Sequence, residues 1–177
     1  MDPMDPESIR LAPKVVLHDH LDGGLRGGTG IELAAPPSYT DQPATDVDDL
    51  STWFLSGAAR RDLGLYLETF AHTVGVMQTA DACHRVAAEC ATDLAADGCV
   101  YAEVRFAPAL HTGRGMSLDE VIEAVLAGFV EGSADTALTV STLVTAMRTD
   151  TDSLGVEVRA MQSAEEAVAG CDMVVAG

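Results

Sequence analysis

Residues 14–23 read KVVLHDHLDG, an apolar run that ends in histidines, aspartates and a glycine. Apolar residues on both faces, followed by glycine, are typical of a buried parallel strand whose carboxyl end reaches a functional site. We therefore predict a strand over residues 14–20. Its two-residue alternation places His18 and His20 on the same face as Val16.

The two histidines of this strand are spaced to share a metal ion. Side chains at positions i and i+2 of a strand project from one face, so the imidazoles of His18 and His20 can converge where the strand ends. Asp22 can reach the same cavity, whereas Asp19 points to the opposite face and is expected to be structural. The pair alone leaves open a second interpretation, that of two ordinary surface or core histidines.

Strand and helix signals alternate along the rest of the chain. β-Branched and aromatic residues predict strands, and apolar residues at three-and-four spacing after capping residues predict helices. This alternation predicts an α/β fold with a parallel sheet and right-handed crossovers. The later strands are expected at residues 99–106, 138–144 and 171–176, and the helices at 163–169, within 31–35, and after caps at Asp48 or Asp49, Asp62, Thr79 and Ser117.

Composition limits the function classes. The 177 residues include 10 Lys and Arg against 28 Asp and Glu, a formal net charge of −18, which argues against a nucleic-acid partner. With 47% hydrophobic residues the chain can bury a core. No apolar run approaches the roughly 18 residues of a membrane span, and the N-terminal residues are acidic, so we expect no membrane partner and a cytoplasmic location.

Two motifs resemble the adenosine deaminase family, the metal-dependent adenosine and adenine deaminases of the amidohydrolase superfamily. KVVLHDHLDG is similar to that family's first barrel strand, which ends in His-x-His-x-Asp-Gly. YAEVRFAPALHT, residues 101–112, is similar to its internal strand Tyr-x-Glu-x-Arg-Phe-x-Pro. The resemblance covers residues 10–148 closely. It implies the N-terminal half of a (β/α)8 barrel.

The resemblance also implies an activity and a site. The family deaminates adenosine to inosine, or acts on related purines, by zinc-dependent hydrolysis. His18 and His20 match its two first-strand zinc ligands, and His20 is also expected to lie against the substrate. Asp22 matches the residue that binds the ribose, and Gly177 of the closing VVAG loosely matches a glycine that contacts the purine. The family's third histidine ligand, metal-binding aspartate, proton-donating glutamate and orienting histidine come from later strands, which implies an incomplete zinc site.

Length bears on how this site can work. At about 30 residues per β/α unit, the chain supplies roughly half of a barrel, and we expect one domain over residues 1–177. Deamination by the chain alone is expected to be impaired, and an exposed sheet edge favours self-association. Two other functions stay open: a non-catalytic half-barrel remnant or interaction module, and a metal-dependent amidohydrolase that acts on another purine or amide.

Other polar residues are expected to be structural. Glu103 and Arg105 share a face of their predicted strand, where they can form a buried ion pair, the expected arrangement, or line the mouth of the barrel. His72 and His84 fall on predicted helices, where histidines usually contact neighbouring helices. His111 follows a strand end and is the only other candidate for a metal ligand, although the resembling family does not use it as one.

Overall fold

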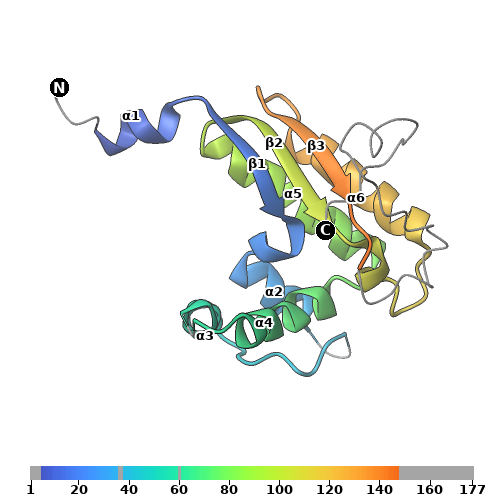
Figure 1. Cartoon of the computed structure of the whole chain (residues 1–177). Coiled ribbons are helices and arrows are strands. Elements are labelled where there is room, and N and C mark those ends of the chain that lie inside the picture. Colours follow the sequence, from blue (N-terminus) through green and yellow to red (C-terminus); the bar gives the residue numbers. More distant parts are fainter. Residues whose placement is uncertain (1–4, 36–37, 60, 148–177) are drawn as a thin grey trace, which may run out of the picture.

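A computed structural model describes residues 5–35, 38–59 and 61–147 of the chain. Within these residues three parallel strands form one sheet in the order β1, β2, β3 (Figure 1). The strands are β1 (Lys14–His20), β2 (Cys99–Phe106) and β3 (Thr139–Val144).

The sheet confirms the predicted α/β architecture. β1 and β2 have the predicted bounds, and β3 begins one residue after its predicted start. Both neighbouring pairs are parallel, as alternation of strands and helices requires. The strand expected at residues 171–176 and the helix expected at 163–169 lie outside the described residues.

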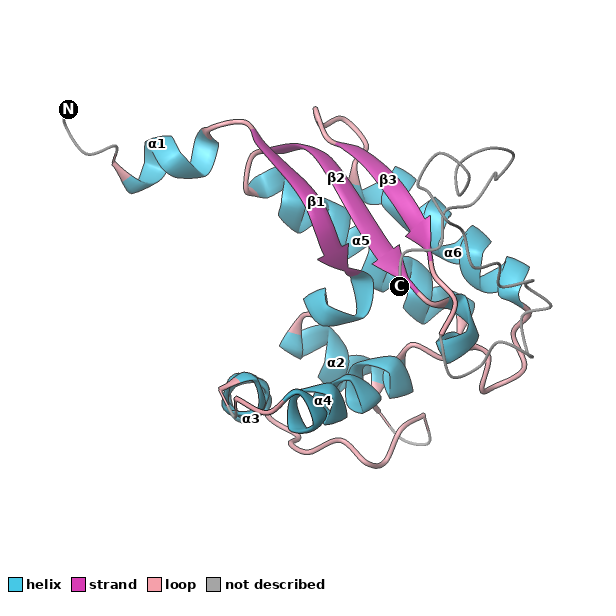
Figure 2. Cartoon of the chain, in the orientation of Figure 1, coloured by secondary structure: helices cyan, strands magenta, loops and turns pink. Residues whose placement is uncertain are grey.

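Two long helices cover one face of the sheet (Figure 2). They are α5 (Ala80–Ala96), capped by Thr79, and α6 (Leu118–Gly132). Ser117 and Glu120 form the capping box at the start of α6, so both predicted caps are confirmed. The core lies between sheet and helices and includes Ala102, Val104 and Phe106 from β2, Cys83, Val86, Ala87, Cys90 and Ala91 from α5, and Val121, Val125 and Phe129 from α6.

The backbones of α5 and α6 lie in direct contact at two glycines of α6. A Cβ atom added to Gly128 would lie 2.2 Å from the carbonyl oxygen of His84, and one added to Gly132 would lie 2.0 Å from that of Ala88. Real side chains do not approach so closely. The absence of a side chain at these two positions therefore sets the distance between the helices.

Between β1 and α5 the chain forms a group of helices at the carboxyl ends of the strands (Figure 1). It comprises the 3₁₀ turn η1 (Leu21–Gly24) and the helices α2 (Gly27–Leu33), α3 (Val47–Ala58) and α4 (Leu63–Val76). The helix α2 begins earlier than the short helix expected within residues 31–35. None of the described helices is both long and apolar enough to cross a bilayer.

The cap of α3 differs from the prediction. Asp46, not Asp48 or Asp49, is the N-cap, and its carboxylate accepts hydrogen bonds from the backbone N–H groups of both predicted caps. In a run of closely spaced acids the cap is the residue with extended backbone, which composition does not reveal. The short helix α1 (Pro6–Leu11), capped by Asp5, was not predicted.

Candidate metal site at the carboxyl end of the sheet

The strand β1 contains a β-bulge between Val16 and Asp19, at the start of its histidine motif. Val16 pairs with Ala102 of β2, whereas Asp19 pairs with Val104, so three steps along β1 match two steps along β2. One extra residue in a strand turns the side chains that follow it to the opposite face of the sheet. Simple alternation therefore fails within this strand.

The bulge separates His18 and His20 from Val16. Val16 packs against the core. Asp19 lies toward the same side, because its carboxylate acts on the Cys90 thiol there. Burial raises the pKa of that thiol to about 12, and the Asp19 carboxylate adds to the rise. His18 and His20 are exposed on the opposite face. The prediction that the two histidines share a face away from Asp19 is confirmed, but their predicted grouping with Val16 is wrong because alternation does not account for the bulge.

The two imidazoles converge on one point. The Nε2 atoms of His18 and His20 lie 3.1 Å apart. Two nitrogens at this separation can each lie about 2.05 Å from one zinc ion, with an angle of about 98° between them, close to tetrahedral. The donor set and its spacing therefore fit a shared zinc ion.

The pair does not form a complete metal site by itself. Zinc takes three or four protein ligands in most sites. Across residues 5–35, 38–59 and 61–147, no group of three His, Cys, Asp or Glu side chains is placed to hold a metal ion. The described part of the chain thus offers two ligands for a zinc ion.

His111 is a core residue and not a third ligand of this pair. It lies in the 3₁₀ turn η2 (Pro108–His111), is 1% exposed, and its Nδ1 lies 3.1 Å from the carbonyl oxygen of Met77. A carbonyl only accepts, so Nδ1 carries the proton. Burial lowers the pKa of this imidazole, while the hydrogen bond and the Asp22 carboxylate act in the opposite direction.

The other two histidines make the contacts expected of structural residues. His72 of α4 has its Nδ1 2.9 Å from the Tyr39 hydroxyl and its ring edge-to-face with Trp53. His84 of α5 lies 3.3 Å from the carboxylate of Glu131 on α6.

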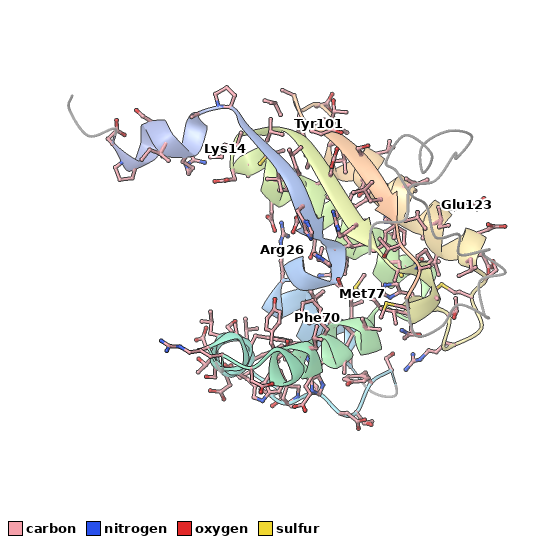
Figure 3. All side chains as sticks on the ribbon, viewed as in Figure 1. Lys14, Arg26, Phe70, Met77, Tyr101 and Glu123 are labelled. Carbon is pink, nitrogen blue, oxygen red and sulfur yellow. The ribbon has the colours of Figure 1, made fainter. Side chains whose placement is uncertain are left out.

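A cavity of about 290 Å³ opens beside the end of β1. Asp22 and Gly23 line it from η1, and α3 and α4 form the opposite wall. The Phe70 ring packs 3.6 Å from the position that a Gly23 side chain would occupy, and Figure 3 shows Phe70 on α4 near the loop that carries Arg26. The remaining lining residues are Leu25, Gly27, Ser51, Phe54, Leu55, Ala58, Tyr66, Thr69 and Thr73.

This lining suits a small amphipathic ligand. Aromatic and aliphatic side chains dominate, and a few hydroxyls and one carboxylate supply directional polar contacts. Asp22 lines the cavity two residues after the histidine pair, whereas neither His18 nor His20 lines it. The wall formed by α3 and α4 was not predicted, because those residues lie 30 to 50 positions away and carry no motif of their own.

Charged side chains hold the loop after β1 against α5. Arg26 makes a two-point contact with Asp93 at 2.5 and 2.9 Å. The Thr29 hydroxyl donates to Glu89 at 2.6 Å, and Arg85 bridges Glu89 to Glu32, 2.7 Å away. These contacts fix a glycine-rich segment that has little conformational preference of its own.

The ion pair expected between Glu103 and Arg105 is not formed. Glu103 accepts a hydrogen bond from the hydroxyl of Tyr101 at 3.1 Å. The Nε atom of Arg105 is buried and has no hydrogen-bond partner among the described residues. The prediction overlooked a competing donor on the same strand face.

The parallel β/α sheet with a His-x-His pair at its carboxyl end is typical of β/α-barrel proteins, whose functional sites lie at the carboxyl ends of the strands. Comparison with known proteins makes this specific. The family model described as adenosine deaminase matches residues 13–176, and the chain belongs to the adenosine deaminase family. Gly177 lies outside the described residues.

Relatives with closely similar sequences carry the same family name. The adenosine deaminase of Mycobacterium sp. (strain KMS) is 54% identical over 176 residues, which cover 97% of this chain and 49% of that protein. The adenosine deaminase of Mycobacteroides abscessus is 59% identical over 150 residues, 82% of this chain and 41% of that protein. The chain thus spans about half the length of the curated relatives that it matches.

Solved structures show the same architecture. The adenine deaminase of Arthrobacter aurescens matches with a TM-score of 0.61 and 26% identity, over 75% of this chain and 38% of that one. The N6-mAMP deaminase of arabidopsis matches with a TM-score of 0.63 and 26% identity, over 78% and 42%. A zinc-bound amidohydrolase at 20% identity and a TM-score of 0.66 has the same fold. The described strands and helices are therefore part of a (β/α)8 barrel.

Proposed function

We propose that this chain provides the first part of a zinc-dependent deaminase that hydrolyses adenosine to inosine and ammonia. The observation that carries the proposal is the pair of Nε2 atoms 3.1 Å apart at the end of β1, next to a cavity that Asp22 lines. Relatives that bear the name adenosine deaminase support adenosine as the substrate.

The residues of the chain have distinct tasks in this reaction. His18 and His20 would hold zinc through Nε2, and His20 would also border the substrate. A bound zinc ion supplies Lewis-acid activation of water at neutral pH. Asp22 would accept a hydrogen bond from a ribose hydroxyl, while Phe70 packs against an apolar face of the nucleoside and excludes water. We also propose a contact between the purine and the backbone of Gly177.

We propose that the chain alone deaminates adenosine poorly. Two imidazoles leave a zinc ion mostly hydrated and weakly held. Among residues 5–35, 38–59 and 61–147 no third ligand completes the site. A site with only two ligands among the described residues also favours a second candidate function, in which the chain is a non-catalytic interaction module that binds zinc weakly.

Metal analysis after dialysis tests the ligands. We expect zinc bound after loading to be lost in the variant that combines His18→Ala with His20→Ala. His84→Ala is the matched control, because this histidine lies on α5 beside Glu131 and should leave zinc binding unchanged. Zinc that stays bound in the double variant would show that the ligands lie elsewhere.

Complementation separates the two candidate functions. We would mix the chain with a polypeptide that comprises the part of the Mycobacteroides abscessus relative that it does not match, and follow the loss of adenosine absorbance. A deaminase predicts turnover in the range of about 1 to 1000 per second for the mixture, far less for either part, and loss of turnover with His20→Ala. An inactive mixture in which the two parts demonstrably associate would favour the interaction module.

A further inference from the structure

Arg105 occupies a distinctive position on the open face of the sheet. It pairs in register with His20 of β1 and with Leu143 of β3. Alternation along β2 places it on the face opposite the buried Val104 and Phe106. No described helix covers that face (Figure 2). The guanidinium therefore belongs to the same end and the same face of the sheet as the histidine pair.

The Nε of Arg105 differs from those of Arg10, Arg26 and Arg85. It is buried and has no hydrogen-bond partner among the described residues. Wherever an arginine Nε is hydrogen-bonded in the described chain, the acceptor is a carboxylate. These bonds run from Arg10 to Glu7 at 3.0 Å, from Arg26 to Asp93 at 2.9 Å and from Arg85 to Glu89 at 3.0 Å.

The nearest acid on the same strand face does not satisfy this donor. Glu103 accepts from the hydroxyl of Tyr101, and turning it toward Arg105 would break that bond. A buried N–H on a charged group that lacks an acceptor is destabilising, because the group has lost water and gained nothing in return. A ligand that accepts a hydrogen bond from this Nε–H would consequently stabilise the folded chain.

We infer that Arg105 forms a carboxylate-binding site on the open face of the sheet. A guanidinium presents Nε and one Nη side by side, and this pair matches the two oxygens of a carboxylate. The carboxylate can come from an acidic side chain or from a small organic acid, which share this chemistry. The inference does not depend on deaminase activity.

Nuclear magnetic resonance of arginine Nε–H groups tests this site in the full chain. With ¹⁵N-labelled arginine, Arg105→Lys identifies the signal of Arg105, because lysine keeps the charge and removes the Nε. Arg105→Gln serves the same purpose if the lysine variant does not fold. The signals of Arg26 and Arg85, already bound to carboxylates, are internal controls. The chain is titrated with sodium formate, sodium chloride and inorganic phosphate at matched ionic strength.

Each outcome has a defined meaning. We expect a saturable downfield shift of the Arg105 signal with formate and none with chloride, while the Arg26 and Arg85 signals stay fixed; this supports a site open to small acids. A signal that is already downfield beside those of Arg26 and Arg85, and insensitive to formate, supports an acidic side chain as the occupant. A signal at the unbonded position that ignores formate overturns the proposal, and so does saturation by phosphate at a lower concentration than formate.

Discussion

Replacement of Gly128 by alanine should destabilise the fold, although alanine is the better helix former. The added Cβ would lie 2.2 Å from the carbonyl oxygen of His84, 2.8 Å from the Cβ of Ala87 and 3.0 Å from the backbone nitrogen of Ala88. Ordinary contact begins at 3.4 Å, so the nearest pair must separate by 3.4 − 2.2 = 1.2 Å. Two of the three obstructing atoms belong to helix backbone, which cannot move without α5 itself moving.

The magnitude follows from two opposing effects. Alanine in place of glycine in a helix interior contributes about 1 kcal/mol in favour of folding. Overpacking costs about 1 to 3 kcal/mol, and backbone obstruction puts this site at the upper end. We therefore expect a net loss of about 2 kcal/mol in the free energy of unfolding. For a chain of this size that corresponds to a fall of about 4 to 8 °C in Tm.

Thermal unfolding followed by far-ultraviolet circular dichroism measures this effect. Gly28→Ala is the matched control, because Gly28 is also helical, in α2, and an added Cβ meets nothing within 4 Å. It should leave the free energy of unfolding unchanged or raise it by about 0.4 to 1 kcal/mol. A Gly128→Ala variant as stable as the unmodified chain would refute the view that backbone contact sets the spacing of α5 and α6.

Three further predictions concern caps and buried titratable groups. Asp46→Ala should lower the free energy of unfolding by about 1 kcal/mol in denaturant titration, whereas Asp48→Ala, which leaves the cap intact, should cost only a few tenths. Burial lowers the pKa of His111, so the folded state prefers the neutral ring. The free energy of unfolding should be full above the ordinary histidine pKa and fall as the pH drops below about 6.5, with a smaller fall in the His111→Gln variant. An equal fall in the unmodified chain and the variant would assign the effect to other groups. Burial raises the pKa of Cys83 to about 11 and that of Cys90 to about 12. Iodoacetamide at pH 8 should therefore label these thiols about 100-fold or more slowly in the folded chain than in denaturant, and rapid labelling of the folded chain would contradict their burial. The free energy of unfolding should also decline as the pH rises above about 9.

Features set by a few adjacent residues were predictable from sequence. Strand bounds at Cys99–Phe106 follow from alternation and β-branched content, and the Ser117 capping box depends on side chains three positions apart. The histidine pair also belongs here, because residues i and i+2 of a regular stretch of strand project from one face, and pairing with β2 is regular from Asp19 to His20. In each case the deciding interaction spans fewer than about ten residues.

Features set by distant contacts were not predictable. The bulge in β1 exists only in relation to β2, whose Val104 pairs with Asp19 across 85 positions of sequence. The glycine-rich helix α2 forms against its own propensity because Arg26 and Thr29 are bound by side chains of α5. One local contact was missed as well: Glu103 accepts a hydrogen bond from Tyr101 and makes no ion pair with Arg105, a choice between two donors on one strand face that residue types alone do not specify.

Because of the bulge in β1, the histidine motif should tolerate the loss of one residue within the bulge but not the loss of a residue after it. Leu17 and His18 both lie on the open face between Val16 and Asp19, so one of these two positions is surplus to the pairing with β2. A natural variant or engineered chain that lacks Leu17 would keep Val16 and Asp19 inward and both histidines outward, in regular alternation. Loss of a residue after the bulge would instead turn one histidine into the core. Deletions among relatives should therefore gather at position 17 and avoid positions 19 and 20.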